Sequence, residues 1–345
     1  MNREKEAEDN GALHPRETTE LFGHADAERT LLDSYRSGHF PHAWLIGGER
    51  GIGKATLAYR MARFVLAHPD PAAPTVQRAT SLALPSDHPV ARRVAGQGHS
   101  DLLVIERTLN DKGKLRQDIA VDDVRRAIPF FGSTAGEGGW RVAIVDAVDE
   151  LNAAGANALL KIVEEPPPRA LLLLVSHAPG RALATIRSRC RRLALRPLNA
   201  DDTAHAVAAA LGQEFAAPEI QSAAEAATGS VDRALMFLTG SALELRRQVA
   251  ALLGLLPELD PRALHAVGDS LAGTDAATLG AFMDTVNGWL AVRLRDRPRG
   301  LARMAAVAET FESINRAARD VEEYNLDRRP FVFAAFDALA EAARG

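Results

Sequence analysis

The chain has 345 residues, of which 47% are apolar and 25% are charged, and its formal net charge is −4. This length accommodates two or three globular domains, and the composition excludes a disordered chain and a disulfide-stapled miniature. The single cysteine, Cys190, excludes an internal disulfide and a zinc site built from several thiolates of this chain.

The charge pattern gives little support for direct DNA binding. A net charge of −4 provides no global basic field, so any contact with DNA is expected to be local or made through partners. Only five of the 41 basic residues are lysine, and this bias makes a cluster of arginines weak evidence for nucleic acid. No apolar run reaches the roughly 20 residues of a membrane helix. The N-terminus MNREKEAEDNG lacks an apolar signal core, so we predict a cytoplasmic protein without membrane contact.

Strand-like and helix-like segments alternate over the first two hundred residues. Residues 1–20 are polar and are predicted to form a loose leader, with the fold starting near Leu21. The predicted elements, in chain order, are a helix at Ala25–Arg36, a strand at Ala43–Ile46, a helix at Ala55–Leu66, strands at Leu102–Ile105, Ile119–Val121 (running into a helix) and Val142–Val145, a helix at Asn152–Glu165 and a strand at Leu171–Val175. Continuous apolar strands between helices indicate a parallel sheet covered on both faces. Residues 67–99, rich in Pro, Ala and His, are expected to be irregular.

After about Pro197 the apolar residues recur at helical spacing almost to the end of the chain. The fold class predicted from these patterns is α/β followed by all-α. The predicted organisation is a leader at 1–20, a P-loop α/β domain at 21–198, a small helical domain at 199–240 and a C-terminal helical domain at 241–345, in which long helices are expected at 242–257, 275–296, 300–323 and 329–343.

A phosphate-binding loop follows the first predicted strand. The stretch GGERGIGKAT has the spacing G-x-x-x-x-G-K, with Gly48, Gly53 and Lys54 in register. Glycines let consecutive backbone N–H groups turn toward phosphate oxygens, the helix N-terminus adds its positive end, and the lysine neutralises the outer phosphates. A chance glycine turn is the alternative, which the preceding strand and the following helix disfavour.

The loop lacks the hydroxyl that would hold magnesium. The full motif has Ser or Thr directly after the lysine, and here that position is Ala55. Thr56 comes one residue late and is rotated by about 100° on a helix, so it points elsewhere. The loop is therefore equipped to hold phosphate but poorly equipped to hold metal.

A second nucleotide element is incomplete in the same way. The apolar strand at 141–146 ends in Asp146, as a Walker B strand does, but Ala147 stands where hydrolysing enzymes usually carry a glutamate that polarises water. Asp149 and Glu150 lie further on and are the alternative bases. Losing both the metal hydroxyl and the base predicts a chain that does not hydrolyse ATP itself.

These motifs, with others along the chain, resemble those of a known protein family. The run Arg141–Cys190 closely resembles the AAA+ subunits of the bacterial DNA polymerase III clamp loader. The motifs that carry the resemblance are the aspartate-ended strand, Asn157–Lys161 (NALLK), Glu164–Pro167 (EEPP), Ser188–Cys190 (SRC), and Phe40–Ala43 followed by the glycine loop. Among these subunits the chain is most similar to the delta prime group, because the ATPase subunits keep the residues that are missing here.

The resemblance implies roles for further residues. In the family the S-R-C motif carries an arginine finger for the neighbouring subunit's ATP site, which Arg189 would supply. A structural ion pair, or the general arginine bias, is the alternative for Arg189. Cys190 is expected to be a packing residue rather than a reactive thiol. Ser176 occupies the family's sensor-1 position. Together the predicted nucleotide-site residues are Gly48, Gly51, Gly53, Lys54, Ala55, Thr56, Asp146 and Ser176.

Two features depart from the family pattern. The stretch Gly229–Leu235 resembles the sensor-2 region, but Asp232 stands where an arginine is expected, and Arg233 would face elsewhere on a helix. Relatives often carry a four-cysteine zinc module where this chain has residues 67–99, which contain no cysteine. The spacing of His68, His88, His99, Asp87 and Asp101 fits no standard metal site. We therefore expect no zinc and no bound metal.

The resemblance implies a clamp-loader subunit that helps load the sliding clamp onto primed DNA during replication. Its partners would be gamma/tau and delta subunits in a hetero-pentamer, with the sliding clamp and primer-template DNA bound through the complex. The small helical domain would be the lid and the C-terminal one the collar. No cofactor is expected to be required, although the loop keeps the residues that bind the phosphates of ATP or ADP. Any DNA polymerase activity would belong to the assembled holoenzyme and not to this chain by itself. The alternatives are an active gamma/tau-like ATPase, with Thr56 or water as the missing ligand, and a nucleotide-binding scaffold unrelated to replication.

Overall fold

The computed structural model divides the chain into two compact units, Met1–Leu235 and Met236–Gly345. The described residues are 13–344 without 111–115, 117, 134, 137–138, 181–182, 239, 273–275, 296–300 and 325. The first twelve residues of the expected leader therefore lie outside the described part.

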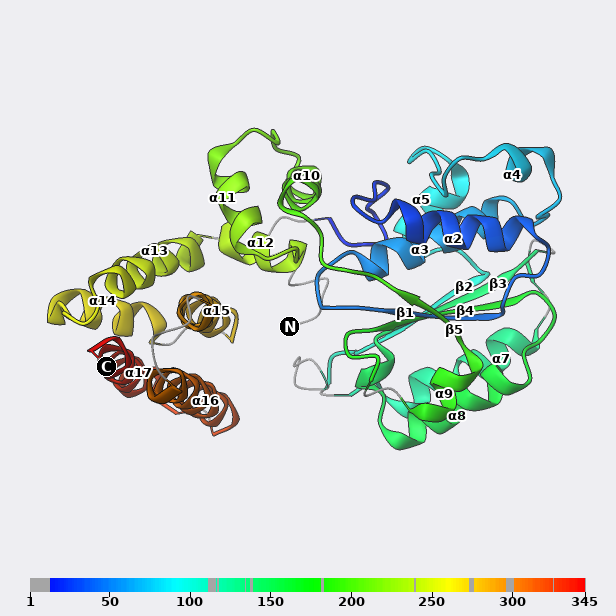
Figure 1. Cartoon of the computed structure of the whole chain (residues 1–345). Coiled ribbons are helices and arrows are strands. Elements are labelled where there is room, and N and C mark those ends of the chain that lie inside the picture. Colours follow the sequence, from blue (N-terminus) through cyan, green and yellow to red (C-terminus); the bar gives the residue numbers. More distant parts are fainter. Residues whose placement is uncertain are drawn as a thin grey trace. The chain divides into compact units, whose positions relative to one another are not determined.

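A five-stranded parallel sheet forms the centre of the first unit (Figure 1). Its strands are β1 (Ala43–Gly47), β2 (Leu102–Glu106), β3 (Arg141–Asp146), β4 (Ala170–Ser176) and β5 (Arg191–Ala194), in the order β2-β3-β4-β1-β5. β1 and β4 are buried throughout, which accounts for their uninterrupted apolar sequences. The parallel α/β sheet predicted from the sequence is confirmed.

Helices cover both faces of this sheet (Figure 1). They are α2 (Ala25–Arg36), α3 (Lys54–Ala67), α4 (Pro74–Arg78), α5 (Pro89–Ala95), α6 (Val121–Arg125), α7 (Ala127–Gly132), the short 3-10 helix η1 (Val148–Glu150), α8 (Ala153–Glu164) and α9 (Ala184–Arg189). Alternate residues of β1, β2, β3 and β4 enter two cores. In β3, Val142 and Ile144 join the core with α2, α3 and α5, whereas Ala143 and Val145 join the core with α6, α7 and α8.

One local expectation was wrong, and one strand was missed. The strand expected at Ile119–Val121 is a single bridge between Ile119 and Leu151, and α6 begins immediately after it. The edge strand β5 was not predicted, because its sequence RRLA has only Leu193 buried. An edge strand with exposed charged residues gives no apolar run to detect.

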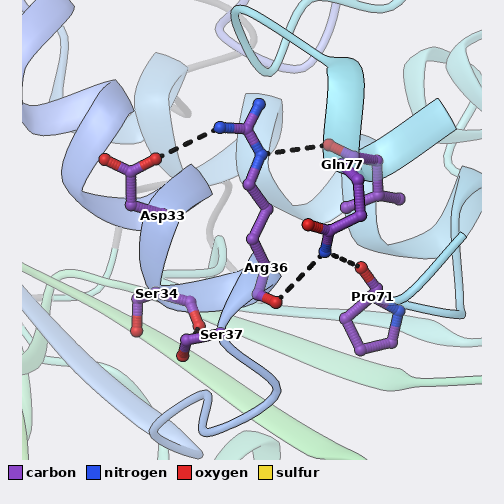
Figure 2. Close-up of polar contacts among 7 residues, drawn as sticks. Asp33, Ser34, Arg36, Ser37, Pro71 and Gln77 are labelled. Carbon is purple, nitrogen blue, oxygen red and sulfur yellow. Dashed lines mark hydrogen bonds and ion pairs between the residues drawn. The ribbon is translucent and has the colours of Figure 1, made fainter. Parts of the chain in front are cut away.

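The segment 67–99 is hydrogen-bonded to the end of α2. It contains the two short helices α4 and α5, each beginning with proline at its first position. Arg36 Nε donates to the carbonyl oxygen of Val76 at 3.0 Å, and Gln77 Nε2 donates to the carbonyl oxygens of Arg36 at 3.2 Å and Pro71 at 2.8 Å (Figure 2). The irregular segment expected here is therefore an ordered structure held by these reciprocal hydrogen bonds.

All the regular elements described after β5 are helices. The helices are α10 (Ala200–Leu211), α11 (Pro218–Ala226), α12 (Val231–Leu238), α13 (Gly240–Leu255), α14 (Pro261–Leu271), α15 (Ala276–Arg295), α16 (Leu301–Glu323) and α17 (Arg328–Arg344). The last five pack around one apolar core in the second unit. The helix α14 was not predicted, although Asp260 caps it by accepting the N–H of Arg262 at 2.9 Å. The helical region predicted to follow the sheet is confirmed.

Residues 13–20, part of the expected leader, are held against the first unit. The side chain of Arg63 on α3 is 2% exposed and donates to the carbonyl oxygens of Arg16 at 2.9 Å and Thr18 at 2.6 Å. At the other end of the segment, the N–H of Leu13 donates to α10. The segment thus joins the helix after the phosphate loop to the first of the three small helices.

Candidate nucleotide site and arginine finger

The phosphate loop lies at the carboxyl end of β1, between β4 and β5 in the sheet. It ends at Gly53, which precedes α3 with φ +95°, and Gly51 has φ +78°. Both values lie in the left-handed region, which glycine adopts without steric cost. The first N–H groups of a helix have no partner within the helix and point beyond its N-terminus, where they favour an anion.

The lysine of the loop is buried and folded back. Lys54 is 3% exposed, and its ammonium donates to the carbonyl oxygen of Glu49 within the same loop. Ala55 and Thr56 are half-buried in the first turn of α3, and a methyl group occupies the position of the metal-binding hydroxyl.

Two polar residues predicted for the site lie at the same edge of the sheet. Asp146 ends β3 and Ser176 ends the adjacent strand β4, and both are buried. Ser176 is paired with Gly47, and its carbonyl oxygen accepts the N–H of Gly48 at 3.3 Å. Among the described residues, the hydroxyl of Ser176 has no hydrogen-bond partner. The sheet therefore gathers the loop, Asp146 and Ser176 at one edge.

The two carboxylates considered as alternative bases have structural partners. Asp149 accepts the backbone N–H of His177 through both oxygens, at 3.0 and 3.1 Å. Glu150 forms an ion pair with Arg107 at 2.8 Å, in which both side chains are mostly buried. Each carboxylate is thus engaged in holding neighbouring segments together.

Arg189 lies at the opposite edge of the sheet. It ends α9, two residues before Arg191, which pairs with Trp44 near the start of β1. Arg191 is three residues, or about 10 Å at 3.3 Å per residue, before Ala194, which pairs with Gly47 at the start of the phosphate loop. The side chain of Arg189 is 42% exposed and forms an ion pair with Glu164 at 3.0 Å. Arg189 also donates to the carbonyl oxygen of Thr185 at 3.2 Å.

The segment that resembles sensor 2 packs on the phosphate loop. Asp232 lies against Gly51, since a Cβ atom placed on that glycine would be 2.8 Å from the Asp232 Cβ. Arg233 points elsewhere and donates to the hydroxyl oxygen of Thr228 at 2.7 Å, near the end of α11. The loop therefore has a carboxylate beside it and no guanidinium from this segment.

Two contacts to the loop were missed by the sequence analysis. His24, just before α2, places Nε2 2.5 Å from the carbonyl oxygen of Ile52, and Ser230 Oγ donates to the carbonyl oxygen of Arg50 at 3.0 Å. Burial lowers the pKa of His24, and the Lys54 charge lowers it further, while the bond to Ile52 and the Asp202 charge oppose the shift. Both contacts join segments far apart in sequence, and no spacing rule announces them.

Three further features were checked among the described residues: metal-binding clusters, the cysteine thiol and membrane-spanning helices. No group of three or more His, Cys, Asp or Glu side chains is placed to hold a metal ion among the described residues. Cys190 is half-buried against the core beneath α8, and burial raises the pKa of its thiol to about 11. None of the described helices is long and apolar enough to cross a membrane.

A parallel sheet with a glycine loop between its β1 strand and a helix, an aspartate ending β3, and helical units following the sheet defines the AAA+ class of P-loop proteins. Residues 23–199 match the family model described as "DNA polymerase III, delta subunit". The chain belongs to this DNA polymerase III family.

Two of the curated relatives are subunits of DNA polymerase III. The DNA polymerase III subunit delta' of Pseudomonas aeruginosa is 35% identical over 149 residues, which are 43% of this chain and 41% of that protein. Subunit gamma/tau of Mycobacterium tuberculosis is 28% identical over 328 residues, 91% of this chain and 53% of that protein. The matched regions thus span less than half of the delta' relative and about half of gamma/tau. A solved gamma subunit-related protein from Thermotoga maritima is 15% identical, with a TM-score of 0.48, over 91% of this chain and all of that one.

Proposed function

We propose that this chain is a delta prime-like subunit of the DNA polymerase III clamp loader, which loads the sliding clamp onto primed DNA during replication. In this role it does not hydrolyse ATP, and Arg189 is an arginine finger for a neighbouring ATPase subunit. The observation that carries the proposal is the position of Arg189, at the edge of the sheet opposite its own phosphate loop.

The loss of hydrolysis is supported by the contents of the loop. Ala55 cannot ligate magnesium, and Ala147 cannot polarise water. Asp149 and Glu150, the nearest carboxylates beyond, are bonded to His177 and Arg107. A water-activating role would require one of them to give up these contacts.

The proposed role of Arg189 at a neighbouring subunit's ATP site is supported by the exposure of its side chain and by the weakness of its ion pair. Because Arg189 comes before the amino end of β5 and its own loop follows the carboxyl end of β1, we infer that the phosphate it contacts belongs to another molecule. Its ion pair with Glu164 joins two side chains that are each more than 40% exposed. Exposed pairs of this kind contribute about 0.2–1 kcal/mol, so a γ-phosphate can replace the carboxylate at little cost.

The proposed partners follow from this role. Gamma/tau and delta subunits would complete a hetero-pentamer, and the sliding clamp and primer-template DNA would be bound through the complex. The helices α10–α12 would be the lid, and the second unit would supply the collar, because long amphipathic helices bury apolar stripes against neighbours. We propose no required cofactor and no zinc, with ATP or ADP bound at most without hydrolysis.

The test is reconstitution with gamma/tau and delta subunits, followed by DNA-stimulated ATP hydrolysis and clamp loading. Arg189→Ala should slow the neighbour's site by about a thousandfold or more, leaving the other ATP sites working and assembly intact. Arg125→Ala is the matched control, because Arg125 is likewise an exposed arginine in an ion pair on a helix. Unchanged hydrolysis and loading with Arg189→Ala would remove the central claim.

A second candidate function is an active gamma/tau-like ATPase. It is favoured by the retained Lys54 and Asp146, and by the gamma/tau match over 91% of the chain. The purified chain would then show metal-dependent ATP turnover that disappears in Lys54→Ala. Absence of turnover in a chain that still assembles with its partners would reject this candidate.

A further inference from the structure

The carbonyl groups of the phosphate loop are held by other segments of the chain. The carbonyl oxygen of Arg50 accepts from Ser230 Oγ at 3.0 Å, and that of Gly51 accepts from the N–H of Val231 at 2.7 Å. The carbonyl oxygen of Ile52 lies 2.5 Å from His24 Nε2. Three consecutive peptide groups of the loop are therefore anchored from two places, the start of α2 and the start of α12.

The direction of these hydrogen bonds is fixed by chemistry. A carbonyl oxygen only accepts, so His24 must carry its proton on Nε2 when it faces Ile52. The hydroxyl of Ser230 also accepts the N–H of Arg233 at 3.3 Å, which leaves its single proton for Arg50. His24 is 6% exposed and Ser230 is 5% exposed, so water competes little for either bond.

Anchored carbonyls determine where the loop N–H groups point. In a planar trans peptide the C=O and the following N–H lie on opposite sides. Fixing the three carbonyl groups toward His24 and the start of α12 therefore turns the N–H groups of Gly51, Ile52 and Gly53 the other way. Successive N–H groups beside a helix N-terminus form a concavity that suits an anion.

We propose that His24 and Ser230 are positioning residues that hold this loop in its anion-binding shape before any ligand arrives, so that it takes the diphosphate of a nucleoside without a metal ion. The inference rests on the part of the proposed function in which the loop retains nucleotide. A glycine-rich loop without anchors loses much conformational freedom when it closes on a ligand. Here the restriction is already present in the folded chain, which favours binding.

The choice of ligand follows from the charges around the loop. Lys54 and the N-terminus of α3 provide positive charge for one or two phosphates. Ala55 offers no magnesium ligand, and the Asp232 carboxylate packs beside Gly51. A third phosphate without its metal would add negative charge next to that carboxylate, so the diphosphate is the better match.

The experiment measures ADP binding to the purified full chain by calorimetry in EDTA. His24→Leu and Ser230→Ala should each weaken binding about tenfold, as expected for a lost buried hydrogen bond. His24→Gln keeps a donor near the position of Nε2 and should restore affinity to within about threefold of the wild type. Lys54→Ala should abolish binding.

Two matched controls separate positioning from general damage. His39→Leu removes an exposed histidine that contacts the Ser37 carbonyl, and Ser270→Ala removes a serine hydroxyl bonded to the Ala266 carbonyl within α14; neither of these carbonyls belongs to the loop. Both should bind ADP like the wild type, and thermal unfolding identifies any variant that fails to fold.

The inference is overturned if the wild type does not bind ADP in EDTA, or if folded His24→Leu and Ser230→Ala bind as well as the wild type. It is also overturned if His24→Gln binds as poorly as His24→Leu. None of these results affects the arginine finger, which is judged by the reconstituted complex and Arg189→Ala. Failure of the further inference is thus distinguishable from failure of the proposed function.

Discussion

Arg63 offers a sharp test of how the N-terminal segment is held. Its side chain is 2% exposed on α3 and donates to two backbone carbonyls, those of Arg16 and Thr18. Burial, together with the charge of Arg60, lowers the pKa of Arg63 to about 10, which is still well above neutral, so the donors are charged at pH 7. Arg63→Met keeps most of the apolar stem and removes every donor.

The magnitude follows from two opposing terms. Hydrogen bonds to a charged group contribute about 1.5–3 kcal/mol each, so two such bonds account for about 3–6 kcal/mol. Removing a buried guanidinium relieves part of its desolvation cost, which offsets some of this loss. We expect the free energy of unfolding of the first unit to fall by about 2–4 kcal/mol, and its Tm to fall by about 5–15 °C.

The assay is urea or thermal unfolding of the purified chain, with limited proteolysis of the N-terminal segment. The two compact units are expected to unfold separately, so only the transition of the first unit should move. Arg262→Met, at an exposed position on α14, is the control and should change stability by less than about 0.5 kcal/mol. A comparably small change with Arg63→Met, and unaltered cleavage before residue 20, would refute this account of the anchor.

Three further outcomes are expected. Burial lowers the pKa of His24 and of His68 below 6.5, so their neutral forms favour folding; unfolding measured from pH 8 to 5 should show this stability intact above about pH 6.5 and lost below it, and a flat profile would contradict the shifts. Asp232→Asn should raise ADP affinity about two- to fivefold at low salt, with the gain shrinking as salt is added; an unchanged affinity would show that the carboxylate does not reach the ligand. The side-chain amides of Asn287 and Asn315 bond reciprocally at 2.9 and 3.1 Å between α15 and α16; single alanine variants should each cost about 1 kcal/mol, and a double-mutant cycle with no coupling would exclude a cooperative pair.

The sheet was largely predictable because its strands carry their own signal. β1 and β4 are apolar at every buried position apart from the ends, and a run of this kind between helices has few other interpretations. β5 gave no such signal, since three of its four residues are exposed and two of those are arginines. It becomes a strand by pairing with β1, which is a tertiary effect that local sequence does not contain.

The candidate site likewise has a part that the sequence predicts and a part that only the folded chain shows. Lys54 and its glycines are set by a contiguous motif, so the sequence alone locates them. His24 and Ser230 act on that motif from positions 28 and 180 residues away from their partners. Each is an ordinary polar residue beside a helix start, and only the folded chain shows that its bond ends on the phosphate loop.

The parallel direction of the strands explains how the ATP site of the phosphate loop could be lost while Arg189 keeps its role. All five strands run the same way, so the phosphate loop lies beyond the carboxyl ends and Arg189 before the amino ends. Groups more than about 10 Å apart usually affect stability and binding independently. In the proposed function, alanine at positions 55 and 147 would therefore remove metal binding and water activation without disturbing the arginine. In the proposed ring, the edge of this chain that carries Arg189 would face the phosphate loop of a neighbouring subunit. A chain that does not hydrolyse ATP would then still supply the arginine that the neighbour's ATP site requires.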